Sequence, residues 1–155
     1  MKAHHKSPLP AGANLRTALA AGPPIQAIFS IIPAIEIVEM IGLAGFTAVI
    51  LDMEHGPYDI DSIGGLILAA RARASMPVAR VRRLDAALIG AALDAGAAGV
   101  LVPQITSPAG AAPLSAPHVL RRRECEALIL GCERPISKLH LIGSASRTHA
   151  SRSWS

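Results

Sequence analysis

Short apolar runs alternate with segments of helical periodicity through the first two thirds of the chain. The β-rich runs cover residues 25–32, 47–53, 77–81 and 99–105, and a short helix over residues 15–21 is predicted before the first of them. Between the runs, apolar residues recur at helical spacing. The predicted order is therefore a helix followed by β-α-β-α-β-α-β. Strictly alternating units with continuous apolar strands are typical of a parallel sheet with right-handed crossovers.

Capping residues predict where several of the helices begin and end. Pro33 suits the first position of the helix after the first strand, because its fixed φ is already helical. Asp59 or Asp61 caps the next helix, and Asp85 caps the one after it, which Gly96 closes. The spacing of roughly 25 residues per unit fits either a doubly wound sheet or the first half of a (β/α)8 barrel.

The chain changes character near residue 112. The alternation stops there, and an arginine-rich run, a short apolar patch and aperiodic Ser, Arg and His follow. We therefore divide the sequence into a disordered N-terminus (1–13), an α/β domain (14–112) and an aberrant basic tail (113–155). We interpret this tail as an out-of-frame translation or an unnatural end. A divergent, partly disordered tail is the alternative.

Composition indicates what kind of core the chain can build. It is 51% hydrophobic and only 3% aromatic, so Ala, Ile, Leu and Val are expected to fill the core. Prolines interrupt the longest uncharged stretches, residues 17–35 and 95–120, which excludes them as membrane-spanning helices. No continuous apolar segment follows Lys2 and Lys6, so no signal peptide is predicted and the cytoplasm is the expected location.

The net charge of +4 comes entirely from the tail. Residues 1–112 hold eight basic and eight acidic side chains, whereas residues 113–155 hold seven basic and three acidic ones. The basic tail raises an alternative function, a non-enzymatic module that binds nucleic acid or an acidic partner. We rank it last, because the tail lacks interleaved aromatic residues and helical periodicity. Nucleotide binding is not favoured either, since no Gly-x-Gly-x-x-Gly follows the first strand.

Asp52 and His55 are the first candidates for chemistry. They lie where the second apolar run ends and a Gly-Pro loop begins, and active sites of α/β proteins are built at the carboxyl ends of strands. A carboxylate bonded to one imidazole nitrogen fixes the tautomer and raises the basicity of the other nitrogen. The alternative is a histidine that only ties down the loop. Glu54, between them, is a candidate to hold a metal-bound water or the pair, or is simply solvated.

Arg80 and Gln104 end the third and fourth predicted strands at the same edge of the sheet. The planar guanidinium of Arg80 suits a carboxylate or an enolate oxygen, and neighbouring strand ends would place it near His55. Otherwise it is an ordinary surface arginine, as Arg82 and Arg83 are expected to be. Gln104 is either a hydrogen-bond partner of a ligand or a polar cap on a buried strand. The two cysteines and the other histidines show no ligand spacing.

Taken together, these residues resemble the HpcH/HpaI aldolase/citrate lyase family, which includes aldolases related to 4-hydroxy-2-oxoheptanedioate aldolase and 2-dehydro-3-deoxy-rhamnonate aldolase. The resemblance covers about residues 15–112, in the family's order and spacing. Its most specific part is Leu-Asp-Met-Glu-His-Gly-Pro at 51–57. Reinforcing segments are Pro-Val-Ala-Arg at 77–80, Asp-Ala-Gly-Ala at 94–97 and Val-Pro-Gln at 102–104.

The resemblance implies a (β/α)8 barrel, usually homo-oligomeric, that binds a divalent metal such as Mg²⁺, Mn²⁺ or Co²⁺. It implies cleavage of 4-hydroxy-2-oxo acids to pyruvate, or a related 2-oxo acid, and an aldehyde. Carried over to this chain, His55 is the base in the proton transfers, oriented by Asp52. Arg80 binds the 2-oxo acid and stabilises the enolate. The expected partners are thus small-molecule substrates, with neither a membrane nor nucleic acid.

The family's two metal-binding carboxylates are not found in this chain. They lie after the fifth and sixth strands, in Gln-x-Glu-type and Gly-Pro-x-Asp-type segments, neither of which follows the fourth predicted strand here. The sequence therefore predicts a truncated family member, the N-terminal half of a (β/α)8 barrel with about four β/α units. Without those metal ligands, this chain is expected to be inactive.

Overall fold

A six-stranded sheet runs through the part of the protein that the computed structural model describes, residues 15–20, 25–105, 126–130 and 139–142. Its strands are β1 (Ala27–Ser30), β2 (Ala48–Asp52), β3 (Met76–Arg80), β4 (Gly99–Val102), β5 (Glu126–Leu130) and β6 (Leu139–Ile142). The helices in this part are α1 (Leu15–Ala20), α2 (Ile35–Leu43), α3 (Ile60–Ala72) and α4 (Ala86–Asp94). The predicted order of elements is confirmed as far as β4. None of these described helices is long and apolar enough to cross a membrane.

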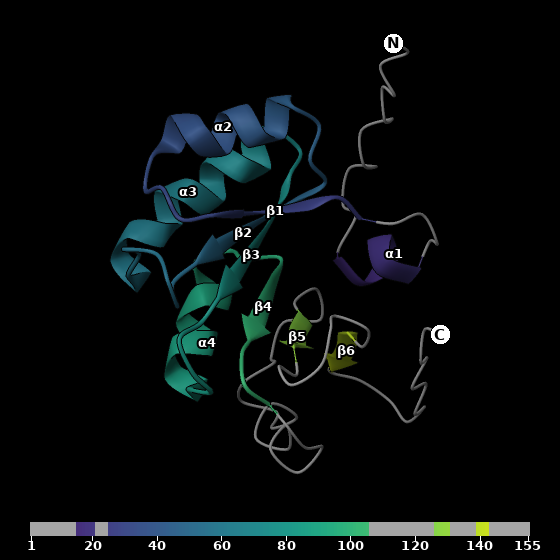
Figure 1. The fold of residues 1–155 in the computed structure, drawn as a ribbon, viewed down its shortest axis with the longest axis vertical. Helices are drawn as coiled ribbons and strands as arrows, with labels where there is room; N and C mark the ends of the chain where they lie inside the picture. Colours follow the sequence, from purple (N-terminus) through teal and green to yellow (C-terminus); the bar gives the residue numbers. More distant parts are fainter. Residues whose placement is uncertain (1–14, 21–24, 106–125, 131–138, 143–155) are drawn as a thin grey trace.

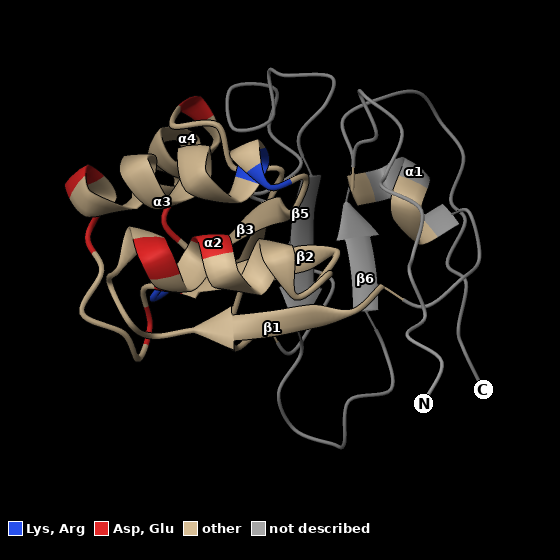
Figure 2. Cartoon of the chain, turned by 90° about the horizontal axis from the view of Figure 1, so that it is seen from above, with Lys and Arg blue, Asp and Glu red and all other residues tan. Residues whose placement is uncertain are grey.

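The crossover helices lie on one side of the sheet. The strands follow one another in the order β1-β2-β3-β4-β5-β6, with the first five parallel and β6 antiparallel to β5. Helices α2, α3 and α4 connect consecutive strands and cover the same face, whereas α1 lies on the opposite side (Figure 1, Figure 2). A doubly wound sheet would carry crossovers on both faces. This sheet is singly wound, as in a (β/α)8 barrel, which decides between the two architectures that the spacing allowed.

Two strands lie in the segment where a disordered tail was predicted. β5 is an apolar run behind Glu126, and it pairs with β4 from Gly99 opposite Glu126 to Val102 opposite Ile129. A run of four apolar residues is too short to show the period of a strand or of a helix in the sequence. Pairing with a neighbouring strand is what makes it a strand. The remainder of residues 113–155 and the predicted disordered N-terminus lie outside the described residues.

A capping box begins α3. Asp59 accepts a hydrogen bond from the N–H of Ser62 (2.8 Å), and Ser62 Oγ accepts one from the N–H of Asp59 (3.0 Å). Asp59 and not Asp61 is therefore the cap. Asp85 caps α4 as predicted, by accepting the N–H groups of two residues in its first turn. These caps place the starts of both helices directly after the loops that follow β2 and β3.

The start of α2 differs from the prediction. Ala34 is the N-cap and Ile35 the first helical residue, so Pro33 precedes the helix. The N–H of Ala34 donates to the carbonyl of Ile32 (2.9 Å), which puts Pro33 in a tight turn that its fixed φ suits equally well. Gly96 does follow α4 with a φ of +102°, the left-handed conformation that closes a helix.

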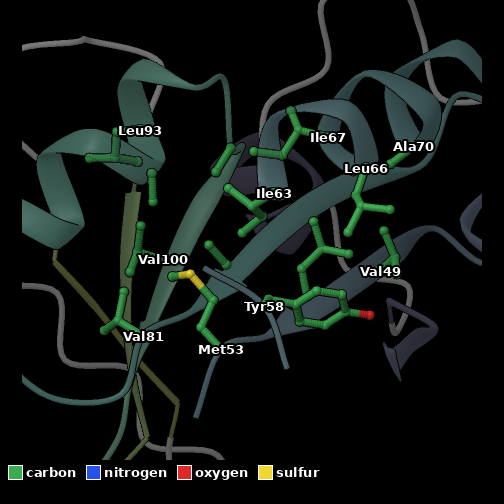
Figure 3. Close-up of a cluster of buried hydrophobic side chains, with 14 of the residues drawn as sticks. Val49, Met53, Tyr58, Ile63, Leu66, Ile67, Ala70, Val81, Leu93 and Val100 are labelled. Atoms are coloured by element: carbon green, nitrogen blue, oxygen red, sulfur yellow. The ribbon is translucent and has the colours of Figure 1, made fainter. Parts of the chain in front are cut away.

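Strand alternation divides the core between the two faces of the sheet. Val49 and Leu51 of β2 belong to a large buried cluster with α2, α3 and α4, in which Tyr58 is the largest fully buried side chain (Figure 3). A smaller cluster, on the other face, packs Leu15 of α1 against Ala48 and other residues of β2, β3 and β4. Polar residues of β2 and β3 follow on this second face, toward the carboxyl ends of the strands.

Candidate functional site

Asp52 and Arg80 end neighbouring strands and lie opposite each other. They are the last residues of β2 and β3 and are paired in the parallel register. Alternation places both on the sheet face away from the crossover helices, since the preceding residues, Leu51 and Ala79, belong to the cluster that packs against those helices. Active sites of α/β proteins lie at this carboxyl edge. The structure thus places Arg80 opposite Asp52 at this edge, and its predicted place near the His55 side chain stays a prediction.

The guanidinium of Arg80 is held by two carboxylates and an aromatic ring. Its Nε donates to Asp52 Oδ1 (2.8 Å) and its Nη2 to Asp52 Oδ2 (2.6 Å), a bidentate pair. Glu54 Oε2 lies 3.2 Å from the same Nε. The ring centroid of Phe29, from β1, lies 4.9 Å from Arg80 Cζ, within cation–π range. We call these four residues the Arg80 cluster; in it, two negative charges surround one positive charge.

Asp52 also fixes the loop that follows β2. Its Oδ1 accepts the backbone N–H groups of Glu54 (3.0 Å) and His55 (3.1 Å), and its side chain is only 4% exposed. Burial by itself raises the pKa of Asp52. The hydrogen bonds and charge of Arg80, together with the two backbone N–H groups, lower it by more, so this pKa lies below its usual value. Asp52 therefore remains ionised at neutral pH.

The contact between Asp52 and His55 differs from the predicted pairing of carboxylate and imidazole. Within the described residues, Asp52 binds the backbone N–H of His55, and its second oxygen is occupied by Arg80. A guanidinium with five N–H donors and a permanent charge satisfies a buried carboxylate better than one imidazole N–H does. Asp52 thus orients the loop backbone, and His55 is exposed beside the strand end.

Tyr58 joins this loop to the end of β1. Its hydroxyl group donates to the carbonyl of Ile32 (2.7 Å) and lies 3.0 Å from Ser30 Oγ. Burial, with the nearby charge of Asp52, raises the pKa of Tyr58, although the hydrogen bond with Ser30 opposes this. Neither Tyr58 nor Phe29 was predicted as a site residue. In a chain with one Tyr and two Phe, their positions beside predicted strand ends were the available signal.

Gln104 lies apart from the Arg80 cluster. In the register of β3 and β4, Arg80 is opposite Leu101, so Gln104 is three residues further along the chain and beyond the end of β4. It is exposed and has a φ of +61°, a conformation that is strained for a residue with a Cβ atom. Among the described residues, no hydrogen bond joins it to the cluster. Its role in substrate binding stays a prediction.

The carboxylates of the Arg80 cluster do not fit a metal centre. Asp52 and Glu54 both direct an oxygen at Arg80, so a metal ion would compete with this guanidinium for the same ligands. In the part of the chain that the structure describes, no group of three or more His, Cys, Asp or Glu side chains is placed to hold a metal ion. Contact of Glu54 with a metal-bound water stays a prediction.

The chain is similar to known aldolases in sequence. Residues 28–128 match the family described as HpcH/HpaI aldolase/citrate lyase. A hydroxypyruvate/pyruvate aldolase of Paraburkholderia phytofirmans is 37% identical over 99 residues, which are 64% of this chain and 37% of that protein. A 5-keto-4-deoxy-D-glucarate aldolase of Salmonella paratyphi A is 36% identical over 74 residues, 48% of this chain and 29% of that protein. The matched parts are thus about a third of the length of these relatives.

The similarity extends to solved structures. The crystal structure of the citrate synthase SbnG superposes with a TM-score of 0.68 and 26% sequence identity, over 75% of this chain and 54% of that one. The predicted fold class, the N-terminal part of a (β/α)8 barrel, is confirmed by this match and by the singly wound sheet. The family match runs to residue 128, and so includes part of β5 beyond the boundary drawn at residue 112.

Replacing Gly56 by alanine is expected to disturb the loop that carries His55. A Cβ atom at Gly56 would overlap the carbonyl oxygen of Asp52 and lie 3.0 Å from the Tyr58 ring. The N–H of Gly56 also donates to that carbonyl (2.9 Å), so the loop cannot move away without losing this bond. We expect Gly56→Ala to lower the free energy of unfolding by about 1–3 kcal/mol in urea denaturation.

Gly64→Ala is the control for this change. Gly64 lies inside α3, where an added Cβ would meet nothing within 4 Å, so we expect a gain of about 0.5–1 kcal/mol from helix propensity. A Gly56→Ala protein as stable as the wild type would contradict the loop geometry.

The low pKa of Asp52 predicts how stability depends on pH. A carboxylate whose pKa is lower in the folded chain contributes stability that is present above its unfolded pKa, about 3.9, and is lost as the pH falls through the folded value. We therefore expect the free energy of unfolding to fall below about pH 4 more steeply in the wild type than in Asp52→Asn. Urea denaturation at several pH values measures both slopes, and equal slopes would refute the pairing with Arg80.

Proposed function

The chain belongs to the HpcH/HpaI aldolase/citrate lyase family, and we propose that its described β/α units carry the part of an aldolase site that binds a 2-oxo acid and transfers the proton. The proposed reaction is cleavage of a 4-hydroxy-2-oxo acid to pyruvate, or a related 2-oxo acid, and an aldehyde. One relative is named for hydroxypyruvate and pyruvate and another for 5-keto-4-deoxy-D-glucarate, which supports an oxo acid as the substrate class.

The orientation of Arg80 is the observation that carries this proposal. Asp52 and Glu54 engage its Nε and one N–H of Nη2, so the Nη1 edge of the guanidinium is where a ligand carboxylate can bind. The bidentate pair and the Phe29 ring hold the guanidinium plane, which reduces the entropy lost when a ligand binds. The side chain of Arg80 remains 16% exposed and can be reached from solvent.

His55 is proposed as the base. In the cleavage direction its imidazole takes the proton of the 4-hydroxyl group, and the C3–C4 bond breaks to release the aldehyde. The electrons of that bond pass into the 2-oxo acid fragment, which becomes an enolate. Arg80 stabilises the negative charge of this fragment. A proton added at C3 of the enolate then gives pyruvate or the related 2-oxo acid.

The chain of 155 residues is proposed to bind the oxo acid without turning it over. The family resemblance implies that a divalent metal would polarise the 2-oxo group. Its ligands would lie after the fifth and sixth strands of the family's barrel, in the two segments that are not found in this sequence. Asp52 and Glu54 are already paired with Arg80 and cannot replace those ligands without leaving it. Homo-oligomeric assembly and a cytoplasmic location stay predictions. Most of the basic tail, which the nucleic-acid alternative needs, lies outside the described residues.

Pyruvate binding tests the role of Arg80. We expect Arg80→Lys to weaken binding about tenfold or more. Lysine keeps the charge but lacks the planar guanidinium, whose separate N–H groups can bind Asp52 and a ligand carboxylate at the same time. Line broadening of ¹³C-labelled pyruvate in NMR titrations measures this. Arg83→Lys is the matched control, since the Arg83 side chain is 78% exposed and pairs with Asp85 at 3.4 Å. Unchanged affinity in Arg80→Lys, or equal losses in both variants, would refute the proposed site.

Turnover tests the proposed lack of activity. We expect the purified chain with Mn²⁺ and a 4-hydroxy-2-oxo acid to release no more pyruvate than Mn²⁺ alone does, in an assay coupled to pyruvate detection. His55→Ala is assayed in parallel. Pyruvate release by the wild type that disappears in His55→Ala would show that the chain is an active aldolase and would contradict the proposed lack of activity.

A further inference from the structure

Arg82 joins the two ends of the loop that carries His55. Its Nε donates to the carbonyl of Met53 (2.7 Å), and its Nη2 donates to the carbonyl of Tyr58 (2.9 Å). Met53 and Tyr58 come before and after the exposed turn that contains His55. One guanidinium therefore closes this loop with two charge-assisted hydrogen bonds from its rigid fork.

Other contacts hold the loop at one end only. The N–H of Met53 donates to the carbonyl of Arg80 (2.9 Å), which continues the pairing of β2 with β3. The N–H of Gly56 donates to the carbonyl of Asp52 (2.9 Å) and tightens the turn. Arg82 differs from both, because it fixes the distance between the residues at which the turn leaves the core and returns to it.

We propose that Arg82 is a positioning residue for His55, an inference that rests on the proposed role of His55 as the base. The side chains of Met53 and Tyr58 are fully buried in the core, so each end of the loop has a fixed anchor. Arg82 holds the carbonyl groups of these two anchors in one orientation. That orientation sets the direction of the backbone through the turn, and hence where the turn places the exposed His55 side chain.

The neighbouring Arg83 shows that position in the fold, and not charge, distinguishes Arg82. Both residues follow β3 and carry the same charge. Arg83 extends to Asp85, the cap of α4, and its side chain is 78% exposed. Arg82 extends back across the sheet edge to the loop after β2. Variants of these two residues therefore change the net charge equally, while only one of them affects the loop.

Histidine-ring NMR and amide hydrogen exchange on the full chain test this inference. The ring signal of His55 is assigned by its loss in His55→Gln. We expect Arg82→Gln to shift that signal and to speed the exchange of the His55 and Gly56 amides about tenfold or more. Arg83→Gln is expected to leave both unchanged. Arg82→Lys keeps the charge but lacks the fork, and we expect it to shift the His55 signal as Arg82→Gln does.

Two results would overturn the inference. One is a His55 ring signal and loop exchange in Arg82→Gln that match those of Arg83→Gln. The other is full restoration by Arg82→Lys, which would assign the effect to charge alone. If Arg82→Gln does not fold, the comparison of Arg82→Lys with Arg83→Lys decides in its place. Failure of pyruvate to bind would refute the proposed function and leave these measurements of the loop unchanged, so the two failures can be told apart.

Discussion

The ion pair between Asp52 and Arg80 is the interaction on which the site depends. A carboxylate that is 4% exposed needs a charged partner, since an unpaired buried charge is strongly destabilising. The parallel register of β2 and β3 places that partner directly opposite. The same carboxylate accepts the N–H groups of Glu54 and His55, so it fixes the arginine and the loop of the proposed base together. One side chain thus connects the sheet, the loop and the group proposed to bind the oxo acid.

The singly wound sheet explains why these residues lie on one face. Because α2, α3 and α4 all cover the other face, every second residue of β2 and β3 packs against helices and the alternate residues are left free of them. Near the amino ends, Leu15 of α1 covers these alternate positions. At the carboxyl ends they are Asp52 and Arg80, and the polar group forms where the apolar cover ends. The place of the Arg80 cluster therefore follows from the strand order and from the side of the sheet that the crossover helices cover.

Much of the fold could be predicted from the sequence, because each β/α unit has its own periodicity and cap. The strand-end positions of Asp52 and Arg80 follow from the same periodicity. Their pairing with each other, in place of a pair between Asp52 and the His55 ring, depends on which donor reaches the carboxylate in three dimensions. Arg82 is an exposed arginine, as predicted, but its hydrogen bonds to the two ends of the loop could not be predicted for the same reason. β5 was missed because its short apolar run becomes a strand only beside β4.

The most direct measurement is the NMR signal of the Arg80 Nε–H, identified by its loss in Arg80→Lys and followed as pyruvate is added. If Asp52 holds Arg80 while the Nη1 edge binds the ligand, the Nε–H exchanges slowly with solvent and stays protected in the complex. The signals of the Nη1 hydrogens shift instead. Loss of Nε–H protection on addition of pyruvate would show that the ligand displaces Asp52, which would contradict the central role of that ion pair in the site.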